Sequence, residues 1–281
     1  MDMITEKVRV ITEDSLIMEG LLYRSNKKSK NIVINVHGTA GNFYTTNFID
    51  EMAKKYTDSS IDFMPMNNRG HDYISEIQKS DGKGSKLIGY TYEKFTDCVY
   101  DIKAYVDFAV RKGYKNIILQ GHSLGAVKCA YYMASKTDNR VKGLIFASPP
   151  DMIGLGKVEG NTNKIGKDLF SINRKNFHQI ISSETLKQLR KKDSPADIFS
   201  TYDIKKRSIL ERIRQPIFAF FGDTNEATIM ESFTALKIIR EKASSCKDFT
   251  YKVFKGANHI YLGHEKEVAS SAANWVKEKL N

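Results

Sequence analysis

Short apolar runs alternate with longer amphipathic stretches along most of the chain. The apolar runs predict buried strands at 32–36, 61–66, 117–119, 141–147, 217–221 and 249–254. The amphipathic stretches predict helices at 43–57, 92–112, 228–242 and 264–280. Alternating strands and helices are typical of a mostly parallel sheet that is covered by helices on both faces. The pattern therefore predicts the α/β class.

Three regions depart from this rhythm. Residues 4–12 and 15–23 alternate apolar and polar positions, which predicts an N-terminal β-hairpin. A stretch rich in Gly, Ser and Lys that ends near Gly89 is interpreted as a loop. Between 151 and 215 the alternation stops, and only short helical pieces such as 183–192 are predicted. We therefore expect a core made of 1–150 and 216–281, interrupted by an insertion at 151–215.

The most informative stretch is 116–126, where an apolar strand runs into Gly121-His-Ser-Leu-Gly125 and then into a helical pattern. A strand, a G-x-S-x-G sequence and a helix in this order make up a nucleophile elbow. The turn is so tight that the positions two before and two after the serine must lack a Cβ. Ser123 is therefore the predicted nucleophile, at a helix N-terminus whose dipole favours an oxyanion. The alternative interpretation is a glycine-rich turn between strand and helix, in which the serine has no catalytic role.

His259 is the predicted general base. It lies between the last predicted strand and the last predicted helix, so it falls at the sheet edge to which the elbow also belongs. A base that takes the proton of the Ser123 hydroxyl has to come from a loop at this edge. The chain order of serine first and histidine last also fits this assignment.

Taken together, these motifs resemble the α/β-hydrolase superfamily, which includes serine esterases, lipases and thioesterases. The resemblance runs over nearly the whole chain and rests on His37-Gly38, Arg69-Gly70, Gly121-His-Ser-Leu-Gly125, Gly222-Asp223 and Gly256-Ala-Asn-His259. It implies that 151–215 is a lid. An oxyanion hole needs two N–H donors. One is the N–H of Leu124, which follows the nucleophile, and the resemblance makes Thr39 the other, with Ala40 as its neighbour.

The triad acid is where the sequence departs from the family pattern. Many relatives carry an Asp three residues after the glycine of the penultimate strand, but this position is Asn225 here. Asparagine can orient a histidine, yet it cannot stabilise imidazolium by charge. Glu226 is the next residue and is our first choice. Asp223, for which a turn residue is the other interpretation, and Asp151, after the preceding strand, stay open as alternatives.

Composition narrows the function classes. The net charge is +11, but the lysines are spread along the chain without a basic tail, so we expect a solvated basic surface rather than nucleic-acid binding.

No stretch reaches the roughly 18 apolar residues of a membrane span. The N-terminus has charges where a signal peptide needs an apolar core, so a cytoplasmic protein is expected. The cysteines, Cys98, Cys129 and Cys246, are interpreted as free thiols.

The predicted function is hydrolysis of a carboxylic ester or thioester through an acyl-enzyme on Ser123, with no metal or organic cofactor. Basic clusters at 190–192 and 205–207 are usually a solvated face, but they could favour an anionic or carrier-linked small-molecule substrate. An acyltransferase that uses the same acyl-enzyme is one alternative. A binding protein with a decayed site is the other.

Overall fold

A computed structural model describes residues 3–158, 170–172, 180–191, 193–200, 207–224 and 228–280. Its centre is an eight-stranded sheet with the strand order β1-β2-β4-β3-β7-β8-β11-β12. The strands are β1 (Ile4–Ile11), β2 (Ile17–Arg24), β3 (Asn31–Val36), β4 (Asp62–Met66), β7 (Asn116–His122), β8 (Val141–Ala147), β11 (Ile217–Gly222) and β12 (Phe249–Phe254). From β4 to β12 all neighbours pair in parallel, whereas β1 and β2 form the antiparallel edge.

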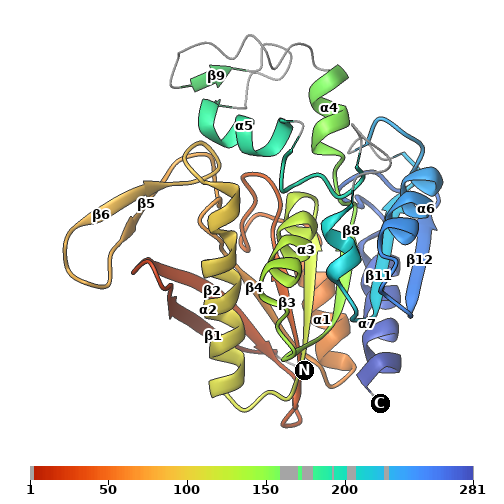
Figure 1. The fold of residues 1–281 in the computed structure, drawn as a ribbon. Coiled ribbons are helices and arrows are strands. Elements are labelled where there is room, and N and C mark those ends of the chain that lie inside the picture. Colours follow the sequence, from red (N-terminus) through yellow and green to blue (C-terminus); the bar gives the residue numbers. More distant parts are fainter. Residues whose placement is uncertain are drawn as a thin grey trace.

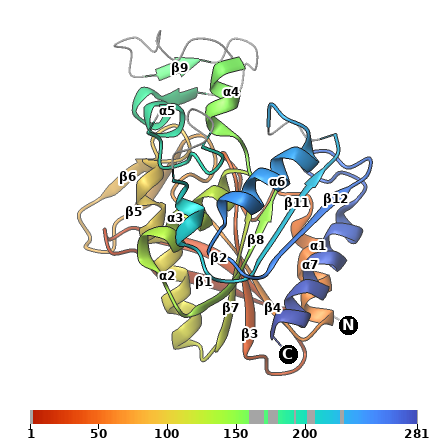
Figure 2. The ribbon, with the colours of Figure 1, turned by 45° about the vertical axis from the view of Figure 1, so that its right-hand side comes forward.

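Helices cover both faces of the sheet (Figures 1 and 2). One face carries α1 (Ile49–Asp58) and α7 (Glu265–Leu280), which contact each other. The other face carries α2 (Cys98–Arg111), α3 (Leu124–Lys136) and α6 (Ser232–Lys242). The predicted α/β architecture, with helices on both faces, is therefore confirmed.

The central strands contain continuous apolar runs because both of their faces are buried. In β3, Ile32 and Ile34 belong to the hydrophobic cluster under α2 and α3, whereas Val33 belongs to the cluster under α1 and α7. In β7, Leu119 and Ile118 divide in the same way. This two-sided burial is typical of parallel strands between helical layers, and it explains why these segments have continuous apolar runs rather than alternation.

Element boundaries differ from the prediction where side chains compete with the helix. The helix predicted at 43–57 begins only at Ile49, because the Asn42 Oδ1 accepts hydrogen bonds from the backbone N–H groups of Tyr44 and Thr45. The helix predicted from residue 92 begins as a 3₁₀ turn at Phe95 and continues as α2. Its predicted end is confirmed by Gly113, which has a φ of +93° just after the last turn.

The prediction of a loop that ends near Gly89 is wrong in part, because this stretch contains an antiparallel hairpin. Strands β5 (Ser75–Gln78) and β6 (Ser85–Ile88) pair over their whole length and extend away from the main sheet in Figure 1. Their turn includes Gly82 and Gly84, both with positive φ. The strands are short and mostly polar, so their alternation gave too weak a signal against the turn-forming residues around them.

The segment 151–215 separates two neighbouring strands, β8 and β11. Its described elements are α4 (Met152–Val158), β9 (Phe170–Ile172), β10 (Ile180–Ser182), α5 (Ser183–Arg190) and a 3₁₀ turn at Ile209–Arg212. In both views α4 and α5 lie beyond the carboxyl end of β8 (Figures 1 and 2). Among the helices of the described residues, none combines the length and the apolar character that a bilayer span requires.

Candidate active site

The expected strand, turn and helix at 116–126 are present, as β7, Ser123 and α3. Ser123 has φ 55° and ψ −130°, a strained conformation for a non-glycine residue. Its N–H donates to the Ala147 carbonyl oxygen of β8 at 2.8 Å, which fixes the turn against the sheet. A Cβ at Gly121 or Gly125 would collide with backbone atoms of the turn and of β3. This geometry raises the Ser123 side chain out of the sheet edge at the first turn of α3.

His259 lies in the loop between β12 and α7 and contacts the elbow. The His122 Nε2 is 2.8 Å from the His259 carbonyl oxygen, and the two imidazole rings have centroids 4.9 Å apart. The His122 side chain therefore reaches the backbone of the candidate base and holds it in place. Burial lowers the pKa of His259 to about 3, and His122 contributes in the same direction. The ring is thus neutral near pH 7, which is the form a general base needs.

Ser123 and His259 line the same cavity, which has a volume of about 510 Å³. One part of its wall is apolar, with Phe48, Pro150, Met152, Leu155 and Ile260. Met152 and Leu155 come from α4, so the 151–215 segment contributes to the wall. Arg190, at the end of α5, contributes as well. The cavity is therefore lined both by loops at the sheet edge and by residues of the segment between β8 and β11.

The loop after β3 lines the cavity next to the serine. Gly38 packs so closely that a Cβ on it would be 2.7 Å from the Ser123 Cβ. Thr39 follows it and lines the cavity. Leu124 is the first residue of α3, a position whose N–H has no acceptor within the helix. The two expected oxyanion donors thus belong to backbone segments that meet at Ser123.

The structure describes two of the four acid candidates, and the carboxylate of each accepts a hydrogen bond from a backbone N–H. Asp223 is exposed, and its Oδ1 accepts a 2.6 Å hydrogen bond from the Gly256 N–H, which joins the loop after β11 to the loop after β12. Asp151 is buried, and its Oδ1 accepts from the Gly154 N–H at 2.8 Å at the start of α4. Asn225 and Glu226 lie outside the described residues.

Sequence reasoning missed a buried charged pair behind the elbow. The Lys128 Nζ lies 2.6 Å from the Glu93 Oε2, and both side chains are essentially inaccessible to solvent. The one available signal was a lysine in the otherwise apolar helical segment after Gly125. A lysine within an apolar run is usually a solvated position, so the pattern alone did not single it out.

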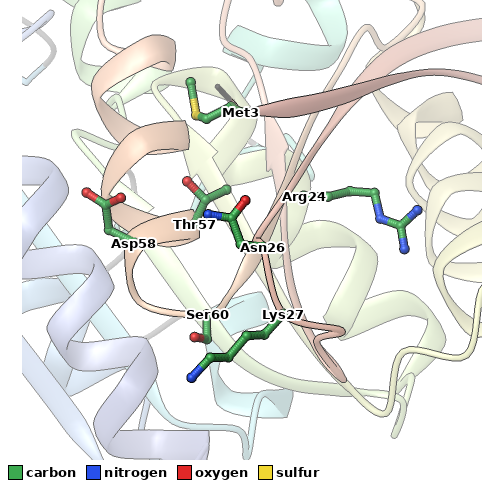
Figure 3. Close-up of a pocket in the computed structure, with 7 residues that line it drawn as sticks. All are labelled: Met3, Arg24, Asn26, Lys27, Thr57, Asp58 and Ser60. Carbon is green, nitrogen blue, oxygen red and sulfur yellow. The ribbon is translucent and has the colours of Figure 1, made fainter. Parts of the chain in front are cut away.

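A second hollow, of about 330 Å³, lies near the end of α1 and the turn after β2 (Figure 3). Its charged side chains do not converge, since Arg24 and Asp58 extend to opposite sides in this view. Asp58 is also paired with Lys54 at 2.8 Å. Within the described part of the chain, no group of His, Cys, Asp and Glu side chains is arranged to hold a metal ion. The three cysteines are free, with Cys98 and Cys129 buried and Cys246 half-buried.

One family model matches the chain. Residues 27–188, more than half of the chain, match the family model described as serine aminopeptidase, S33. No curated protein is significantly similar to the chain in sequence.

Several solved structures share the fold. Est1E from Butyrivibrio proteoclasticus, solved with ferulic acid bound, is 16% identical with a TM-score of 0.70, over 97% of this chain and 99% of that one. The esterase Pf2001 from Pyrococcus furiosus is 17% identical with a TM-score of 0.63, over 98% and 90%. DcsB, in complex with its substrate analogue, is 14% identical with a TM-score of 0.72, over 98% and 99%. The chain therefore has the α/β-hydrolase fold and belongs to the serine aminopeptidase, S33 family of hydrolases.

Proposed function

We propose that this protein is a serine hydrolase that cleaves carboxylic esters or thioesters through an acyl-enzyme on Ser123. The observation that carries the proposal is the cavity that Ser123, on a strained elbow, shares with a neutral His259. A nucleophile, a base and backbone N–H donors around one cavity are the parts that acyl transfer requires. Membership of a hydrolase family and the fold shared with esterases support the same reaction class.

The proposed reaction proceeds in two halves. The Ser123 Oγ attacks the carbonyl carbon while His259 takes the hydroxyl proton, and the N–H groups of Leu124 and Thr39 stabilise the oxyanion. The tetrahedral intermediate collapses, and the alcohol or thiol leaves with the proton from His259. A water molecule then attacks the acyl-enzyme and gives a proton to His259, and His259 passes this proton to the Ser123 Oγ as the acid is released. Glu226 is the proposed acid that orients His259.

The cavity wall favours an ester or thioester over a peptide with a free N-terminus. An aminopeptidase has to bind the substrate's α-ammonium group, for which carboxylates are the natural partners. Among the described residues that line the cavity, none is Asp or Glu. Arg190 is instead the one lining residue of the described set that is charged near pH 7, because burial keeps the three lining histidines neutral. We therefore propose an anionic or carrier-linked acyl substrate, with 151–215 acting as its lid.

Two alternatives use the same site differently. In an acyltransferase another nucleophile replaces water, and the outcome depends on how well the lid excludes water from the acyl-enzyme. In a binding protein the serine would be unreactive. The first alternative predicts that an added alcohol or thiol acceptor is acylated faster than water, and the second predicts no reaction with a fluorophosphonate probe.

The proposal is tested with Ser123→Ala and a matched control, Ser80→Ala, which removes the hydroxyl of an exposed serine in the β5–β6 hairpin region. Hydrolysis of p-nitrophenyl acetate is measured for both. We expect Ser123→Ala to lose nearly all turnover, by about 10⁴-fold or more, and Ser80→Ala to match the parent. Equal turnover in the parent and in Ser123→Ala would overturn the proposed function.

A further inference from the structure

A buried ion pair lies directly behind the nucleophile helix. Lys128 is one turn after Leu124 on α3, and its Nζ donates to the Glu93 Oε2 at 2.6 Å and to the Asn68 Oδ1 at 3.0 Å. The side chains of Lys128 and Glu93 are 0% and 1% exposed. Removing two charges from water is costly, and well-packed apolar residues often stabilise a core at least as well as a buried pair. Stability alone is therefore a weak explanation for this pair.

The hydrogen bonds of the pair continue to the loop after β3. The Asn68 backbone N–H donates to the His37 Nε2 at 3.0 Å, and the His37 Nδ1 lies 2.8 Å from the Gly38 carbonyl oxygen. A carbonyl oxygen only accepts, so the proton of His37 is on Nδ1 and its Nε2 has the lone pair. Burial lowers the pKa of His37 to about 3, and the charge of Lys128 acts in the same direction. The neutral tautomer that this arrangement needs is thus the stable one.

This arrangement fixes the direction of a proposed oxyanion donor. The carbonyl of Gly38 and the N–H of Thr39 belong to one planar trans peptide, so they point in opposite directions. A bond from His37 that holds the carbonyl therefore sets where the Thr39 N–H points. The close packing of Gly38 against the Ser123 Cβ leaves the loop little freedom to move.

We propose that the Lys128–Glu93 pair positions the oxyanion hole, acting through Asn68 and His37. The inference rests on the proposed function. Lys128 belongs to the helix that begins with Leu124, and Asn68 binds the histidine that orients the Thr39 peptide. The hydrogen bonds of the buried pair therefore connect the two backbone segments that supply the proposed oxyanion donors. The pair does not contact the substrate, so its residues are positioning residues.

The test removes both charges at once, in Lys128→Met/Glu93→Leu, because each single change leaves one buried charge without its counter-ion. The amide pair Lys128→Gln/Glu93→Gln is the second variant. The control is Lys54→Gln/Asp58→Asn, which removes an exposed pair on α1. We measure the melting temperature, kcat and KM for p-nitrophenyl acetate, and the affinity for a phenylboronic acid, whose tetrahedral adduct with Ser123 places an oxygen in the oxyanion hole.

We expect the folded double variants to keep KM within about two-fold, while kcat and boronic-acid affinity each fall by about 10-fold to 100-fold. This loss is smaller than the roughly 100-fold to 1000-fold loss caused by removing an oxyanion donor, because the donor is misdirected rather than absent. The control should match the parent. Asn68→Ala should add little to the loss in the double variants, since the pair acts through Asn68. Parent-like kcat and boronic-acid affinity in a folded double variant would overturn the inference, as would losses that multiply with Asn68→Ala. Hydrolysis that persists in Ser123→Ala would instead overturn the proposed function.

Discussion

The His122 Nε2 donates a hydrogen bond of 2.8 Å to the backbone carbonyl oxygen of His259. Because the carbonyl can only accept, the proton of His122 is on Nε2. The residue directly before the nucleophile thus holds the loop of the candidate base at a fixed distance from the elbow. Burial lowers the pKa of His122 to about 4, so the bond does not depend on a charged ring.

We predict that His122→Phe lowers kcat by about 5-fold to 10-fold, because it keeps an aromatic ring and removes one buried hydrogen bond worth about 1 kcal/mol. KM should change less than kcat. The control is His264→Gln, which replaces another histidine. His264 lies directly before α7 and is only half-buried. Unchanged steady-state kinetics in His122→Phe would mean that the loop of His259 is held by other contacts.

The triad acid is tested by three substitutions. Glu226→Gln should lower kcat by up to ~10⁴-fold if its carboxylate stabilises the His259 imidazolium. Asn225→Asp should then have little effect. If Asn225 occupies the acid position instead, Asn225→Asp raises kcat and Glu226→Gln leaves kcat nearly unchanged. A large loss in Asp151→Asn alone would assign the acid to the loop after β8, against our ranking.

Arg190 should select for negative charge on the substrate. We compare kcat/KM for a p-nitrophenyl ester that ends in a carboxylate with that for a neutral ester of the same length. Arg190→Gln should lower the ratio of the two values by about 10-fold, whereas Lys187→Gln, which removes an exposed cation from the same helix, should leave it unchanged. Raising the salt concentration should lower kcat/KM only for the anionic ester. A ratio that is insensitive to Arg190→Gln would refute this role.

Acid should destabilise the protein through its buried histidines. The pKa values of His37, His122 and His259 lie at about 3, 4 and 3 in the folded protein, against 6.5 for an ordinary histidine. Between pH 6.5 and about 4 the unfolded chain binds protons that the folded protein does not. The free energy of unfolding therefore falls with falling pH, by up to about 1.4 kcal/mol per pH unit for each histidine.

Urea unfolding of the parent and of His122→Phe between pH 7 and pH 5 measures this effect. The free energy of unfolding should change less with pH in the variant than in the parent, and the difference should equal the contribution of one proton. Equal slopes would show that His122 takes up its proton in the folded protein as readily as in the unfolded chain.

Local patterns were sufficient to predict most of the sheet. Continuous apolar runs such as 117–119 are typical of strands that are buried on both faces, and the glycines around Ser123 are required by one particular turn. The β5–β6 hairpin was missed because its residues contribute little to the core, so their alternation was weak. The start of α1 was misplaced because the Asn42 side chain binds the backbone that the helix would have used.

The contacts around the candidate site were less predictable, because they join segments far apart in the sequence. The bond from His122 to His259 spans 137 residues, and the one from Lys128 to Glu93 spans 35. No local pattern encodes such pairings. The acid that faces His259 is likewise not encoded in a local pattern, and Asn225 and Glu226 stay predictions.

The measurement that tests the central claim most directly is mass spectrometry of the protein during turnover of p-nitrophenyl acetate. A sample quenched with acid in the steady state should contain protein that is heavier by one acetyl group, and peptide mapping should place this group on Ser123. Ser123→Ala should contain no such adduct and should release almost no p-nitrophenol. An acetyl group on another residue, or full release of p-nitrophenol by Ser123→Ala, would contradict the account.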